Sequence, residues 1–219
     1  MQETRHIGRK ASSNILHAID FAKFIDHPLN LYVVIRLGET EDPALVFQKI
    51  HHKCRVWLQR RLQQLGREVL PPLYAFSLEN PTQCRPHVNW MVHIPAELHR
   101  EFQQKLTQWV RKASGSEPGL RDIHISPVDP YTDKRLGNYI VKGTDPRYVD
   151  HLHLTKVACL QGLVRGRRAS PSRALSRAAR AAAGFVPRRD RDKWKARLGD
   201  IAEKPRRLMP PPADEATWF

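Results

Sequence analysis

Two alternating segments lie in residues 73–94, LYAFSLENPTQCRPHVNWMVHI. In both segments every second residue is apolar, which is the two-residue period of a half-buried β-strand. The short link over 80–86 predicts that the two strands pair as an antiparallel hairpin. This pairing predicts that Glu79, His87 and Asn89 converge on the less apolar face of the sheet.

These three side chains present an oxygen, a nitrogen and an amide oxygen to one point. Carboxylate, imidazole and amide groups in that combination suit Mg²⁺ or Mn²⁺ better than a structural zinc ion. We therefore expect Glu79, His87 and Asn89 to be metal ligands, with Mg²⁺ or Mn²⁺ as the cofactor.

The rest of the chain predicts further helices and strands in a regular order. Helical spacing of apolar residues and strand-like alternation indicate a helix over 12–24, a strand over 31–37, helices over 43–66 and 95–115, a strand over 122–128 and a helix over 131–141. Together with the hairpin, this order predicts an α+β fold of ferredoxin-like plan, with helices covering one face of an antiparallel sheet. The other face is expected to stay open.

Composition changes near residue 161. Residues 161–219 contain fifteen Lys and Arg against six Asp and Glu. We predict an N-terminal helix in 1–28, a ferredoxin-like domain in 29–160, and a basic, partly disordered tail in 161–219 with possible short helices.

The charge of the whole chain favours a polyanionic partner. The formal net charge is +15 and the sequence pI is about 10.2, so nucleic acid is the leading expectation. A membrane surface is the rival, but no apolar run of about 18 residues and no secretory leader is visible, so we expect a cytoplasmic protein. The residues expected to contact nucleic acid are Arg85, His93, His124, Arg165, Arg167, Arg168, Arg188, Arg189, Lys193 and Lys195.

Residues 30–145, roughly, resemble the HUH endonucleases, which include the rolling-circle replication initiators of plasmids and phages. The resemblance rests on an acid that ends one strand, Arg-Pro-His-x-polar entering the next, and Asn-Tyr-x-x-Lys over 138–142. It implies a metal held at Glu79, His87 and Asn89, with Tyr139 as the nucleophile and Lys142 as a second catalytic residue. The implied reaction is nicking and joining of DNA, single-stranded or extruded as a hairpin, through a covalent phosphotyrosine.

One departure from the family pattern keeps an alternative open. Family members usually have a second histidine where this chain has Asn89, so a catalytically silent relative that only binds nucleic acid is the second hypothesis. An RNA-binding module is less favoured because the central strands lack an exposed aromatic pair for base stacking. No helicase-type phosphate loop is present, so unwinding would require a separate helicase.

Overall fold

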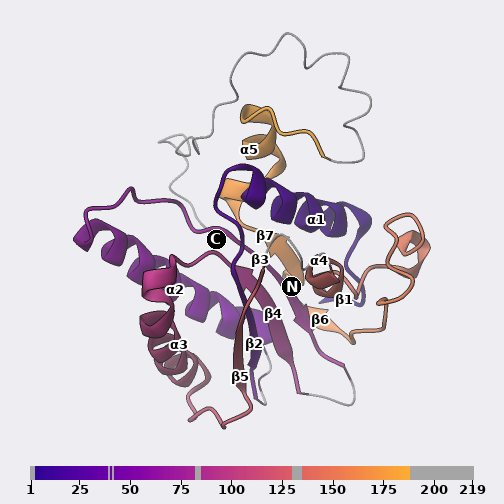
Figure 1. The fold of residues 1–219 in the computed structure, drawn as a ribbon. Helices are drawn as coiled ribbons and strands as arrows, with labels where there is room; N and C mark the ends of the chain where they lie inside the picture. Colours follow the sequence, from indigo (N-terminus) through magenta and orange to yellow (C-terminus); the bar gives the residue numbers. More distant parts are fainter. Residues whose placement is uncertain (1–2, 39, 41, 82–84, 130–134, 188–219) are drawn as a thin grey trace.

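A five-stranded antiparallel sheet forms the centre of the protein, with strand order β5-β2-β4-β3-β7 (Figure 1). The computed structural model describes residues 3–38, 40, 42–81, 85–129 and 135–187. The strands are β2 (Leu31–Arg36), β3 (Tyr74–Glu79), β4 (His87–Val92), β5 (Ile123–Pro127) and β7 (Ala169–Pro171). A small second sheet pairs β1 (Glu3–Thr4) with β6 (Val164–Arg165). The predicted α+β class and the β3–β4 hairpin are confirmed.

Two long helices cover one face of the sheet. α2 (Pro43–Gln64) begins where the Asp42 carboxylate caps the Leu45 amide, and α3 (His99–Ser114) follows the short helix η1 (Ala96–Leu98). Their apolar sides pack on the inward residues of β2, β3 and β4, with Trp90 completely buried between them. The helices predicted over 43–66 and 95–115 are therefore confirmed. Among the described residues, no helix combines the length and apolarity that a membrane crossing needs.

A third helix corrects the prediction that helices cover only one face. α1 (Arg9–Phe24) packs on β3 and β7, where its buried residues share a second core with Ala75 and Met91. These two residues lie on the face predicted to be open, and both are apolar enough to be buried under a helix. On the same face, His124 of β5 is exposed.

The segment after residue 160 also corrects the predicted domain boundaries. β7 extends the sheet beside β3, and it leads into η3 (Arg173–Leu175) and α5 (Arg177–Ala182). Phe185 then packs against Phe21 of α1, with ring centroids 5.3 Å apart. Residues 161–187 and α1 are therefore parts of the same fold, while the predicted tail over 188–219 lies outside the described residues.

A half-buried histidine of α2, His51, makes stability dependent on pH. The His51 ring packs 4.2 Å from the Tyr74 ring centroid, and burial lowers the pKa of His51 from 6.5 to about 4. Because the unfolded chain takes up the proton first, the stability from neutral His51 is present above pH 6.5 and is lost as pH falls toward 4. We expect His51 to account for a loss of about 2–3 kcal/mol in unfolding free energy across this window.

Urea denaturation across that pH range measures this effect. The variant His51→Phe keeps an aromatic ring but does not titrate, so its stability should fall less steeply than that of the wild type. His52→Phe, at an exposed neighbouring position, should keep the wild-type slope. Equal slopes for wild type and His51→Phe would contradict the assignment.

Candidate active site

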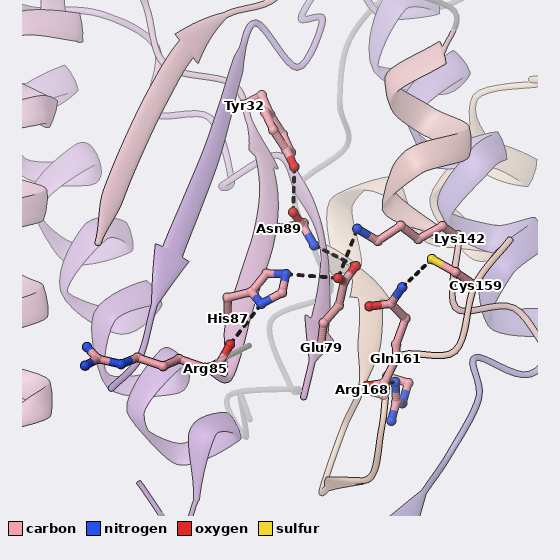
Figure 2. Close-up of polar contacts among 9 residues, drawn as sticks. All are labelled: Tyr32, Glu79, Arg85, His87, Asn89, Lys142, Cys159, Gln161 and Arg168. Carbon is pink, nitrogen blue, oxygen red and sulfur yellow. Dashed lines mark hydrogen bonds and ion pairs between the residues drawn. The ribbon is translucent and has the colours of Figure 1, made fainter. Parts of the chain in front are cut away.

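A buried carboxylate lies at the centre of the candidate site (Figure 2). Glu79 is 3 % exposed. Its Oε1 accepts a hydrogen bond of 2.7 Å from Asn89 Nδ2, and its Oε2 lies 2.9 Å from His87 Nε2 and 3.1 Å from Lys142 Nζ. The structure thus brings together four of the five residues that the sequence indicated as metal ligands or catalytic groups.

Strand register explains why three of these side chains meet. Glu79 is the last residue of β3 and lies opposite His87 in β4, while Asn89 lies opposite Ser77. Positions two apart on one strand project from the same face, so His87 and Asn89 flank the Glu79 carboxylate. The short hairpin link therefore sets the geometry of the site.

The fourth side chain, Lys142, comes from the turn that follows a helix docked against α1. α4 (Arg135–Ile140) approaches α1 closely, because a Cβ at Gly137 would lie only 3.3 Å from Ile19. Ile140 and Val141 are fully buried in the second core. This anchoring carries Lys142, just after α4, to the Glu79 carboxylate.

Tyr139 lies on the same side of the sheet and remains accessible. Its side chain is 41 % exposed, the Lys142 ammonium lies 3.7 Å from its ring centroid, and the Tyr32 ring packs edge-on at 6.4 Å. The phenol therefore adjoins the buried network without being sealed in hydrocarbon. An exposed phenol beside a cation is able to meet a phosphate from solvent.

Tyr32 is a member of the site that the sequence analysis missed. Its hydroxyl donates a 2.5 Å hydrogen bond to Asn89 Oδ1. Burial raises the pKa of Tyr32, and the nearby Tyr139 and Glu79 raise it further, so this hydroxyl remains a proton donor at neutral pH. Alternation in β2 places Tyr32 on the same face as Val34, which lies opposite Asn89, and this signal was available in the sequence.

Lys142 is the cation that balances Glu79. Burial by itself would lower the pKa of Lys142, but hydrogen bonding to Tyr139 and the charge of Glu79 outweigh it, so the pKa is raised. Lys142 is therefore an ammonium at neutral pH. With Lys142 7 % exposed, the two charges form a buried ion pair, and removing one partner leaves an uncompensated charge.

Two of the three predicted metal ligands fit a divalent cation. Ligands held at about 2.0–2.1 Å from an octahedral Mg²⁺ lie about 3 Å from each other, and His87 Nε2 and Glu79 Oε2 are 2.9 Å apart. Asn89 does not fit in this arrangement, because its oxygen accepts from Tyr32 and its nitrogen faces Glu79. Within the described residues, no three or more His, Cys, Asp or Glu side chains are grouped so that they could hold a metal.

Several residues expected to contact nucleic acid are exposed. His124 lies on the side of the site, because it is in register with Val34. Arg85 precedes His87 by two residues, but its guanidinium points away from Glu79 in Figure 2. Arg167 is exposed near β7, and Arg165 is exposed and paired with Glu3 at 2.8 Å. Arg188, Arg189, Lys193 and Lys195 lie outside the described residues.

The structure corrects two of these expectations. Arg168 is buried, and its guanidinium donates to the carbonyl oxygens of Thr4 and Gly162, so it joins β1 to the segment just before β6. His93 is half-buried beyond the opposite end of β4 from His87, with Nδ1 2.7 Å from the Pro28 carbonyl oxygen. Both side chains make hydrogen bonds within the protein, so neither is positioned to contact nucleic acid as predicted.

Comparison with known proteins does not identify a family for this chain. No family model matches the sequence, and no curated protein is significantly similar to it.

Proposed function

We propose that this protein nicks and joins DNA through a covalent link to Tyr139, in the manner of the HUH endonucleases. The observation that carries the proposal is the exposed Tyr139 phenol beside Lys142, on the same sheet face as Glu79 and His87. A nucleophile next to a cation and a potential metal-binding pair is the arrangement that phosphoryl transfer requires.

A ferredoxin-like plan is part of the proposal. Its support is the strand order β5-β2-β4-β3, in which α2 joins β2 to β3 and α3 joins β4 to β5. This is the order of a β-α-β-β-α-β unit with the hairpin strands β3 and β4 adjacent. β7 would then be an additional strand at the β3 edge.

In the proposed reaction the Tyr139 oxygen forms a bond to the phosphorus of a DNA phosphodiester. The bond from phosphorus to the 3′ oxygen breaks, the phenol gives up its proton, and the departing oxygen takes up a proton to become a 3′-hydroxyl. Lys142 lies close enough to the Tyr139 ring to steady the scissile phosphate as it meets the phenol oxygen. Because the 5′-phosphotyrosine conserves the energy of the broken bond, the same site can rejoin the strand.

A Mg²⁺ or Mn²⁺ ion held by Glu79 and His87 would polarise a nonbridging phosphate oxygen. In the structure the Lys142 ammonium contacts Glu79 Oε2 at 3.1 Å, and this is the oxygen that would bind the ion. Binding of the ion therefore requires Lys142 to move away from Glu79.

The exchange between Lys142 and the ion predicts that Lys142→Met binds Mn²⁺ more tightly than the wild type. Removal of the competing ammonium is expected to raise the affinity at least tenfold, which corresponds to about 1.4 kcal/mol. Isothermal calorimetry with Mn²⁺ alone measures this, with His87→Phe as the control that should lose binding. Unchanged or weaker binding by Lys142→Met would contradict the exchange.

A catalytically silent nucleic-acid-binding protein is the second candidate. It is favoured by one observation, that Asn89 presents its oxygen to Tyr32 rather than to the Glu79–His87 pair. Such a protein would bind DNA without metal, with affinity that falls steeply as salt rises. It would form no covalent product.

The proposed partners are single-stranded or hairpin DNA and a separate helicase. The experiment that separates the two candidates uses a labelled random pool of single-stranded DNA with Mn²⁺. A labelled protein band that survives denaturing electrophoresis is expected for a nicking enzyme. Tight binding of the pool with no such band would favour the silent binder.

A further inference from the structure

A large basic groove lies away from the candidate active site. It has a volume of about 1310 Å³ and is lined by residues of α2, β7, η3, α5 and the start of β3. Tyr74, in its wall, and Glu79, in the active site, are the two ends of β3. A six-residue strand places those ends about 17 Å apart, so the groove is a separate surface.

The charges of the groove have a single sign. Lysines and arginines from α2, α3, the turn before β7 and α5 face it, and no Asp or Glu is among its described lining residues. The cations that matter here are Lys49, Lys53, Arg55, Lys112, Arg167 and Arg177. Because they come from elements far apart in the sequence, the fold itself gathers this charge.

The groove also has polar atoms without partners. Ser172 is 3 % exposed and lines the groove, and its hydroxyl has no hydrogen-bond partner among the described residues. The same is true of His51 Nε2, whose ring packs against Tyr74 in the groove wall at an interplanar angle of 59°. Buried polar atoms are normally satisfied, so an orphaned hydroxyl at a basic surface favours a ligand with acceptor oxygens.

The shape favours a linear polyanion over a small phosphate or a lipid surface. The volume exceeds the roughly 300–1,000 Å³ of typical small-molecule pockets. Lys49 and Lys53 are one helical turn apart on α2, so their charges follow each other along the groove. A membrane surface would instead require a projecting amphipathic helix with a basic face.

We propose that this groove, defined by Lys49, Lys53, Arg55, Lys112, Arg167 and Arg177, binds the sugar-phosphate backbone of a single nucleic-acid strand. The backbone oxygens would accept from the cations and from Ser172. This binding goes beyond the proposed nicking reaction and does not depend on it. A protein that never cleaves DNA would still use the groove.

The test uses the full chain with Tyr139→Phe, so that no covalent product forms, and compares two sets of three further substitutions. The groove variant is Lys49→Gln, Lys53→Gln and Arg177→Gln. The control variant is Arg60→Gln, Arg100→Gln and Lys105→Gln, which removes the same charge from positions that do not line the groove. The probe is a fluorescein-labelled polythymidine about 20 nucleotides long, which exceeds typical single-strand site sizes.

The groove variant should bind roughly tenfold more weakly near physiological salt, and its slope of log affinity against log salt should be smaller by about 2. The control should keep the wild-type slope, since it loses no phosphate contact. If both variants lost the same affinity, the effect would come from net charge alone and the proposal would be overturned. Unchanged affinity in the groove variant would also overturn it. Groove-dependent binding to phosphatidylserine vesicles, without binding of the oligonucleotide, would overturn it in favour of a lipid surface.

The result is separable from the fate of the nicking proposal. Groove-dependent binding together with no covalent product from the chain with Tyr139 intact would keep the groove and discard the nicking enzyme. A covalent product together with wild-type binding by the groove variant would do the reverse. Circular dichroism of each variant checks that the fold is retained.

Discussion

Replacing Lys142 by methionine is expected to lower the free energy of unfolding by about 3–5 kcal/mol, since it leaves a buried carboxylate without its cation. Glu79 is 3 % exposed and its Oε2 lies 3.1 Å from Lys142 Nζ. In a chain of this length the loss corresponds to a fall in melting temperature of roughly 6–20 °C. Thermal and urea denaturation both measure it.

Two further variants test the cause of that loss. Adding Glu79→Gln to Lys142→Met removes the orphaned charge, so the double variant should recover at least half of the lost stability. Lys156→Met, at an exposed position, should stay within about 0.5 kcal/mol of the wild type. If Lys142→Met were as stable as Lys156→Met, the buried ion pair would not be a stabilising feature of the fold.

Replacing Tyr139 by phenylalanine is expected to reduce covalent attachment to DNA at least roughly a thousandfold, because the substitution deletes the attacking atom. The side chain is 41 % exposed and its ring would remain beneath the Lys142 ammonium. Stability should fall only modestly, by about 1 kcal/mol, because the hydrogen bond between the phenol and Lys142 is lost while the ring is kept. Counting the radiolabel bound to denatured protein gives the attachment, and urea denaturation gives the stability.

Tyr148 supplies a matched control for this substitution. It is half-exposed and also lies near cations, with Arg147 5.6 Å and Arg9 5.9 Å from its ring centroid. Tyr148→Phe should attach to DNA as well as the wild type does. Attachment by Tyr139→Phe at the wild-type level would remove Tyr139 from the reaction.

Local periodicity was sufficient to predict the central elements of the fold. The stripe along α2 and the alternation in β3 and β4 repeat over many residues, so each element was visible without its neighbours. The sequence did not predict that α1 covers the second face of the sheet, because the docking of α1 depends on tertiary contacts with residues such as Ala75. β7 has only three residues and ends in Pro171, which is too short to show alternation.

The candidate site was predictable where it depends on one hairpin. The register of β3 and β4 follows from alternation and a short link, and it accounts for the meeting of Glu79, His87 and Asn89. The ion pair with Lys142 depends on how α4 docks on α1, which no local pattern shows. Arg168 illustrates the same limit, since a basic segment does not reveal which arginine becomes buried.

Mass spectrometry of the protein after incubation with single-stranded DNA and Mn²⁺ tests the central claim most directly. The nuclease-trimmed and proteolysed sample should contain one nucleotide-bearing peptide, with the phosphate on the Tyr139 oxygen. Attachment at any other residue, or a complete absence of the modified peptide with a random DNA pool, would contradict the account.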